Sequence, residues 1–213
     1  MLEKILNRAV EELKAREEAR QEVLALARRV RMQSKQAIMM MHVGDHEGAK
    51  AKLVETKRGL EGFRRFAGNY AEFIEMSEIR AAWEEYAEAS ILLELKVLGG
   101  FPAPDAIAVP LNAYILGLGD VIGELRREAL ELLRVGDVEA AAESMRTMEQ
   151  IFSSLMSVEE ASVLLKGLRR KLDIARGVIE RTRGELTAEA GRQRLTEHIR
   201  QMMDRLVQDG SSG

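Results

Sequence analysis

Apolar residues recur along most of the chain at the spacing of an α-helix, without the alternating β-branched stretches typical of strands. In residues 2–43, one set of positions falls within a narrow arc at about 100° per residue; it consists of Val23, Ala27, Val30, Ser34, Ala37, Ile38 and Met41. Similar periodicity predicts further helices over residues 46–66, 71–98, 111–134, 137–153, 158–186 and 188–208. The pattern therefore predicts an all-α fold, a single-domain bundle of about six to seven helices over residues 1–208.

Two helix-to-helix turns have the same local sequence. Gly44 and Gly136 each follow a helical segment, where glycine ends a helix easily in the left-handed conformation. Asp45 and Asp137 come next, where a carboxylate can accept a hydrogen bond from the first turn of the following helix. Both segments are thus predicted to be tight turns between helices.

Glycine, proline and serine mark the other interruptions. All three prolines lie in one short stretch, which we expect to be a kinked linker between two helical halves; they are Pro102, Pro104 and Pro110. Residues 209–213 are rich in glycine and serine and are predicted to be a flexible tail or a cloning remnant.

The overall charge excludes some classes of protein. Charged residues make up 31% of the chain, yet the net charge is only -3, so a polyanionic partner must meet a local basic patch. Cysteine is absent, which excludes disulfides and thiolate metal sites. The N-terminus has no apolar leader, and no run approaches the length of a membrane-spanning helix. We therefore expect a cytoplasmic protein with no membrane partner.

The predicted helix 111–134 contains three glycines, each of which costs about 1 kcal/mol relative to alanine in a helix interior. Gly119 and Gly123 are four residues apart and share a face, so a helix backbone or a ligand is predicted to approach them closely. Asp120 and Glu124 repeat this spacing one residue further on. Two carboxylates therefore flank the predicted close contact.

A second pair of carboxylates, Glu85 and Glu88, lies on one turn of the preceding helix. If the two helices pack against each other across the proline linker, four carboxylates converge, and such oxygen donors are those that Mg²⁺ or Mn²⁺ prefers. A di-iron site is not indicated, because no histidine follows a glutamate at the required spacing. The alternative is a set of solvated helix faces, because 35 acidic residues form many such pairs by chance.

Basic residues form one stripe beside the apolar face of the first helix. Arg28, Arg31 and Lys35 lie within two turns of one another and could hold phosphates of a nucleic-acid backbone. The alternative interpretation is an ordinary solvated flank. No aromatic residues interleave with the stripe, so base stacking is not indicated.

The segment Tyr114–Arg127 resembles the central signature of the translin family, which includes translin and translin-associated factor X. Shorter stretches support the resemblance, which covers roughly residues 20–187; they are Glu85-Tyr86-Ala87-Glu88-Ala89, Ser34-Lys35-Gln36-Ala37-Ile38 with His42, Lys171-Leu172 and Arg183-Gly184. The resemblance implies an all-helical protein that assembles into hollow oligomers, typically octamers, holding single-stranded or short duplex nucleic acid. The short proline linker is similar to that of prokaryotic members, which favours a homo-oligomer.

The resemblance also implies an activity, because the factor-X type is a Mg²⁺-dependent endoribonuclease that uses two glutamates and an aspartate. Glu85 and Glu88 match the glutamates, Asp120 matches the aspartate, and Glu124 stands in the family's Gly-Glu-Leu-Arg stretch. The leading hypothesis is therefore an endoribonuclease for single-stranded RNA or short duplexes, with all four carboxylates as catalytic and metal-binding residues. Mg²⁺ or Mn²⁺ would be the cofactor, and single-stranded DNA is a further candidate ligand.

Two other functions stay open at this point. One is a non-catalytic oligomer of the same family that binds single-stranded RNA or DNA, in which the carboxylates serve only packing and solubility. The other is a helical scaffold that binds proteins.

Overall fold

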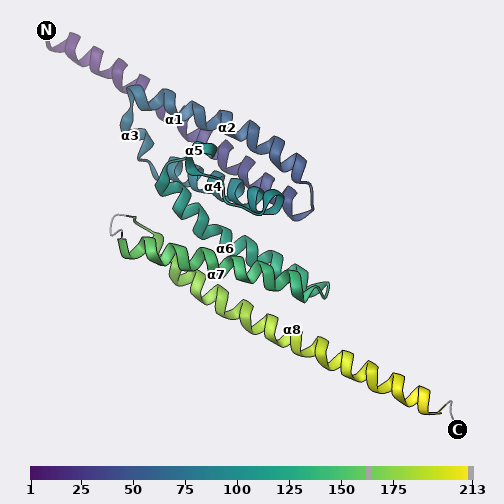
Figure 1. Ribbon diagram of the computed structural model, residues 1–213. Helices are drawn as coiled ribbons and strands as arrows, with labels where there is room; N and C mark the ends of the chain where they lie inside the picture. The colour runs from purple at the N-terminus through teal and green to yellow at the C-terminus, as the bar shows by residue number, and fades with distance from the viewer. Residues whose placement is uncertain (162–164, 211–213) are drawn as a thin grey trace. The chain divides into compact units, whose positions relative to one another are not determined.

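The computed structural model describes residues 1–161 and 165–210, and within them the chain forms eight helices and no strand (Figure 1). The helices are α1 (Leu2–His42), α2 (His46–Asn69), α3 (Ala71–Ile74), α4 (Ser77–Leu98), α5 (Pro104–Ile107), α6 (Leu111–Arg134), α7 (Val138–Ala161) and α8 (Leu168–Gly210). The all-α prediction is confirmed. A search of these residues finds no helix with the length and apolarity needed to cross a bilayer.

The backbone divides into two compact units, residues 1–121 and residues 122–213. The division falls inside α6, so the first half of this helix is described with the first unit and the second half with the second unit. In the first unit α1 packs against α2 and α4, and α2 also contacts α3 and α4. In the second unit α7 packs against α8.

The core of the first unit follows the periodicity of α1. All seven positions that the spacing singles out are buried; they are Val23, Ala27, Val30, Ser34, Ala37, Ile38 and Met41. Ser34 is tolerated there because its hydroxyl donates to the carbonyl oxygen of Val30, 2.9 Å away, so no buried donor is left unmet. From Val23 onward, α1 therefore presents one continuous face to α2 and α4.

Both predicted turns are confirmed, with matching geometry. Gly44 and Gly136 have φ of 84° and 83°, in the left-handed region that glycine enters without strain. Asp45 Oδ1 accepts from the backbone N–H of Gly48 at 2.8 Å, and Asp137 Oδ1 accepts from that of Ala140 at 3.0 Å. The repeated sequence encodes one helix–turn–helix geometry at two places.

The single helix predicted over residues 71–98 is wrong, because the chain forms α3 and α4 with a break between them. Met76 is extended, with ψ of 141°, and begins α4 as its N-cap residue. Phe73 is buried and stacks on Tyr70 with ring centroids 5.0 Å apart. This packing holds the turn between α3 and α4 in place. No glycine or proline marks this turn in the sequence. A second short helix, α5, forms within the proline linker.

The predicted boundary between residues 186 and 188 is also wrong. α8 continues through it, and the Thr187 hydroxyl donates to the carbonyl oxygen of Arg183 at 2.8 Å, a bond that helices accommodate. The chain turns earlier, where Gly167 has φ of 98°. α7 runs past the predicted end at residue 153, and α8 reaches Gly210. Of the tail predicted for residues 209–213, residues 211–213 lie outside the described residues.

Candidate functional site

A glycine on α6 brings this helix into direct contact with the turn of α4 that carries the predicted glutamates. A Cβ atom built on Gly117 would lie 2.8 Å from the carbonyl oxygen of Glu84, 2.9 Å from the Ala87 Cβ and 2.9 Å from the Glu88 backbone nitrogen. Side chains do not approach backbone atoms this closely, so only glycine permits this packing. The α4–α6 contact, defined by these four residues, therefore lies beside Glu88.

The contact is made by Gly117, which the spacing argument did not single out, and not by Gly123. At Gly123 a Cβ would meet no heavy atom of the chain within 4 Å, so no helix of this chain makes the predicted close approach there. Gly117 and Gly123 are six residues apart and thus lie about 120° apart around the helix. The signal that could have identified Gly117 is its expected position opposite a small residue, Ala87, on the facing helix.

Asp120 follows Gly117 by three residues, so the two lie within about 60° of each other around α6. Its side chain is half-buried, as is that of Glu88. The predicted aspartate therefore belongs to the helix turn next to the α4–α6 contact. The sequence prediction required the two acidic helices to face each other, and within the first unit they do so at Gly117.

Glu85 interacts with two basic side chains that the sequence assigned to nucleic-acid binding. Its Oε1 lies 3.5 Å from Nη2 of Arg31 and 3.3 Å from Nζ of Lys35. The side chain of Glu85 is 19% exposed, so this ion pair is partly shielded from water. Glu85 on α4 and two residues of the basic stripe on α1, Arg31 and Lys35, therefore form one charged group, which we call the Glu85 cluster.

The three basic residues of the stripe are not equivalent. Arg28 is exposed and lies one turn before Arg31 on α1. The Nε atom of Arg31 is buried without a hydrogen-bond partner, whereas its terminal nitrogen reaches Glu85. Lys35 is 60% exposed. Its ammonium group therefore has room to leave Glu85 for another anion.

The donor types fit a hard divalent cation, since Glu85, Glu88 and Asp120 supply only carboxylate oxygens. The carboxylate of Glu85 already lies beside two cations, Arg31 and Lys35. Among the described residues, however, no three histidine, aspartate or glutamate side chains stand close enough together to hold a metal ion. The donor chemistry is thus suitable, and coordination would require the carboxylates to turn toward one another.

Glu124 belongs to the second unit, together with the rest of α6. Close by in sequence, Arg126 forms a network with α8. Its Nη1 donates to the Thr182 hydroxyl at 2.6 Å, and both terminal nitrogens donate to the carboxylate of Glu185, at 3.1 and 3.2 Å. Thr182 is buried and its hydroxyl donates to the carbonyl oxygen of Val178. This network joins α6 to α8 inside the second unit.

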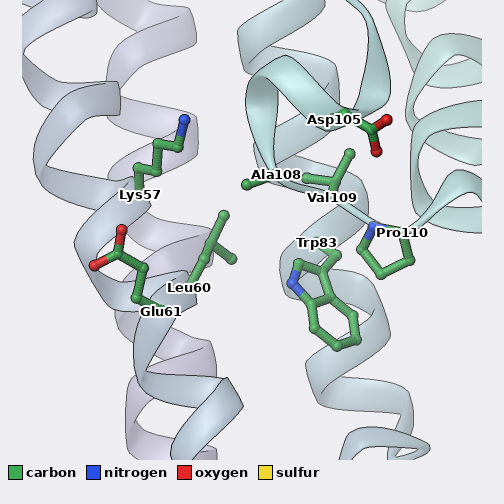
Figure 2. Close-up of a pocket in the computed structure, with 8 residues that line it drawn as sticks. All are labelled: Lys57, Leu60, Glu61, Trp83, Asp105, Ala108, Val109 and Pro110. Carbon is green, nitrogen blue, oxygen red and sulfur yellow. The ribbon is translucent and has the colours of Figure 1, made fainter.

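A separate cavity of about 280 Å³ lies in the first unit between α2, α4 and the proline linker. Figure 2 shows Lys57, Leu60 and Glu61 of α2 across from the linker residues, with the Trp83 indole below them. Trp83 and Glu85 lie about 160° apart around α4, so the cavity opens on a different side of this helix from the Glu85 cluster. None of the predicted site residues lines it.

Comparison with known proteins places this geometry in a family. The model of the translin family matches residues 18–182. An uncharacterized protein of Methanocaldococcus jannaschii, MJ0175, is 30% identical over 206 residues, which cover 96% of this chain and 91% of that protein.

Solved structures agree with these sequence matches. The structure of an AfC3PO–duplex RNA complex has a TM-score of 0.77 and 31% identity, covering 87% of this chain and 96% of that chain. A crystal structure of AfC3PO has a TM-score of 0.74 and 32% identity over the same shares. The apo form of NeC3PO has a TM-score of 0.78 and 26% identity, covering 86% and 96%. The chain belongs to the translin family.

Proposed function

We propose that this protein binds RNA as a homo-oligomer and cleaves it with the help of a divalent cation. The observation that carries the proposal is the Glu85 cluster, in which Arg31 and Lys35 meet an acidic side chain beside the α4–α6 contact. A similar chain, AfC3PO, has been solved in complex with duplex RNA. Basic side chains next to several carboxylates are what a phosphodiester-cleaving site needs, because the substrate is an anion and the metal requires oxygen ligands.

The RNA-binding step depends on exchange of anions within the Glu85 cluster. A phosphate oxygen can replace the Glu85 carboxylate at Lys35, whose side chain is largely exposed. Arg28 lies one turn away on the same stripe and can take a neighbouring phosphate. The backbone of the RNA would thus follow α1, and the freed carboxylate of Glu85 would face the bound strand.

The cleavage step depends on three carboxylates. Glu85, Glu88 and Asp120 would hold Mg²⁺ or Mn²⁺. The ion would polarise the scissile phosphate and lower the pKa of a bound water. The α4–α6 contact fixes the distance between the two helices that carry these side chains, so a rigid backbone supports side chains that must turn. Glu124 follows Asp120 by one helical turn and would act as a further ligand or orienting group. Octameric assembly, and binding of single-stranded DNA, are further parts of the proposal.

A second candidate function is a non-catalytic oligomer that binds RNA or DNA. It is favoured by one observation: Glu85 is engaged by two cations, and no three acidic or histidine side chains of the described part of the chain are gathered for a metal. In that case Glu85 would serve only to hold Arg31 and Lys35 in place for phosphates.

The two functions are separated by incubating labelled single-stranded RNA and a short RNA duplex with the protein in Mg²⁺, in Mn²⁺ and in EDTA. The proposal predicts cleavage with either metal and none in EDTA. Binding without cleavage in all three conditions would establish the second function. RNA affinity that does not change as salt is raised would contradict both and favour a protein-binding scaffold.

Substitutions then test the assigned residues. Glu88→Gln and Asp120→Asn keep the size of each side chain and remove a charge, so we expect each to reduce cleavage at least about a hundredfold while RNA still binds. Glu78→Gln, on an exposed turn of the same helix α4, is the matched control and should cleave at the wild-type rate. Full activity of both site variants would contradict the assignment.

A further inference from the structure

The first three turns of α1 carry an apolar seam that no described residue of the first unit covers. The seam consists of Leu2, Leu6, Ala9 and Leu13; all four are exposed, and the leucines are exposed by 54–69%. Figure 1 shows this end of α1, in purple, extending past the other helices of its unit. Several large apolar side chains on one helix face are a surface that water solvates poorly.

This seam has the same heptad register as the buried face that α1 uses inside its own unit. Leu2, Leu6 and Ala9 precede Val23, Ala27 and Val30 by three heptads each, and the latter three are buried against α2 and α4. Arg16 and Arg20 occupy the seam positions between the two sets, so the apolar residues share one heptad register at the two ends of this stretch and not an unbroken stripe. The spacing therefore indicates that the end of α1 is also built to pack against a helix.

The end of α8 has a seam with the same spacing. It consists of Leu195, Ile199, Met202 and Leu206, whose exposed fractions lie between 49% and 69%. These residues stand at i, i+4, i+7 and i+11, as do those of the α1 seam, so four layers of side chains coincide when the two helices are laid together. In the second unit, too, no described residue covers this seam.

The charges beside the two seams are opposite. In heptad terms, the charged residues that flank the α1 seam are acidic, Glu3 and Glu12. The charged residue that flanks the α8 seam is Arg205, and His198 lies at the equivalent position one heptad earlier. Pairing two α1 ends would bring glutamates together, and pairing two α8 ends would bring basic groups together. Only an α1 end against an α8 end places acidic flanks beside basic ones.

We propose that the α1 seam of one copy of this chain packs against the α8 seam of a second copy. Both seams lie outside residues 18–182, the part that matches the family model. Such a head-to-tail contact uses two different surfaces and can close into a ring of copies. The proposal rests on the homo-oligomer of the proposed function and names the surfaces that join its copies.

The absence of cysteine makes a direct test simple, because any introduced thiol is the only one in the chain. Leu6→Cys and Met202→Cys, in inner layers of the seams, are co-expressed as single variants and treated with a short bismaleimide. Intact mass identifies which chains are joined. The matched control pair is Glu11→Cys with Asp204→Cys, which lie on the outward faces of the same helix ends.

We expect the seam pair to give a cross-chain product containing one chain of each variant, at least about tenfold faster than the control pair, because the contact raises the local thiol concentration. Products that join two Leu6→Cys chains or two Met202→Cys chains would overturn the proposal. A double variant that links only within one chain, or a seam pair no faster than the control pair, would also overturn it. Melting curves of the single variants establish that each is folded.

A second measurement separates this proposal from the proposed function. Leu13→Glu and Ile199→Glu place a charge within each seam, and each should lower the molar mass measured by light scattering while RNA still binds. Wild-type mass in both variants would overturn the seam contact and leave RNA binding untouched. Conversely, cross-chain linkage of the seam pair, together with a wild-type protein that neither binds nor cleaves RNA, would contradict the proposed function alone.

Discussion

Two glutamates, one in each unit, pair with arginine in different ways. Glu185 accepts from Arg126 through both oxygens, at 3.1 and 3.2 Å, and the same guanidinium donates to buried Thr182. Glu85 instead uses one oxygen for two separate cations, Arg31 and Lys35, at 3.5 and 3.3 Å. A bidentate fork with a further buried partner holds one geometry, whereas a single shared oxygen is easily replaced by another anion. In our proposal the Arg126 network is therefore structural, and the Glu85 cluster is the functional one.

The two halves of α6 also differ, in whether their glycine has a packing role. Gly117 in the first half touches the backbone of α4, whereas Gly123 in the second half has open space around it. The same residue type thus has a packing reason in one place and none within the described structure in the other. Substitutions of the two glycines test whether only Gly117 has a packing role. Substitutions in the two ion-pair networks test whether only the Glu85 cluster is needed for RNA binding and cleavage.

The largest effect is expected from Gly117→Ala. The added methyl would lie 2.8 Å from the Glu84 carbonyl oxygen and 2.9 Å from the Glu88 nitrogen, and backbone atoms cannot move aside as a flexible side chain can. We expect a decrease of about 3 kcal/mol in the free energy of unfolding, at the upper end for overpacking, measured by urea denaturation. RNA cleavage should fall as well. A variant with wild-type stability would show that α4 and α6 are not in contact at this point.

A smaller decrease is expected from Arg126→Met, which keeps the apolar stem and removes the guanidinium. The charge-assisted bonds to Thr182 and Glu185 disappear, while the Thr182 hydroxyl keeps its bond to Val178. We expect the free energy of unfolding to fall by about 1–2 kcal/mol, since Glu185 is 43% exposed and stays hydrated. RNA affinity should be unchanged. Loss of RNA binding at wild-type stability would instead make this network part of the functional site.

Arg31→Gln and Lys35→Gln act on the Glu85 cluster, the ion-pair network of the first unit. Each removes a cation from the Glu85 cluster, so each should weaken RNA binding by about 1 kcal/mol, roughly fivefold, with little change in melting temperature. The slope of log affinity against log salt should become shallower by about 0.7 for each phosphate of single-stranded RNA that the variant no longer neutralises. An unchanged slope in both variants would mean that these side chains do not bind phosphates.

The smallest effect is expected from Gly123→Ala, and its sign is opposite. The new methyl meets no atom within 4 Å, and alanine favours the helix by about 1 kcal/mol over glycine. The variant should therefore unfold at a slightly higher urea concentration and cleave RNA normally. A drop in oligomer mass would show that Gly123 faces another copy of the chain.

Local features of the fold were predictable because neighbouring residues determine them. The caps at Asp45 and Asp137 follow from side chains that reach the next turn, and the buried face of α1 follows from its heptad spacing. The break at Met76 and the turn at Gly167 were missed. At the first, Phe73 is buried and stacks on Tyr70, and no glycine or proline marks the end of the helix there.

The candidate site shows the same limit. The acidic residues and the basic stripe could be named from the sequence, because spacing on a helix shows which residues share a face. Their meeting could not, since Arg31 and Glu85 are 54 positions apart and come together only when α1 packs on α4. Gly117 was overlooked for a related reason: its role depends on which turn of α4 it faces.

The most direct test of the functional distinction is the rate of RNA cleavage in Mg²⁺ by Glu85→Gln beside Glu185→Gln, with melting temperatures measured for both. We predict that the cleavage rate of Glu85→Gln falls at least about a hundredfold at nearly wild-type stability. Glu185→Gln should cleave normally and melt at a lower temperature. Wild-type cleavage by Glu85→Gln, or an equal fall in rate in the two variants, would contradict the assignment of the Glu85 cluster as the site of catalysis.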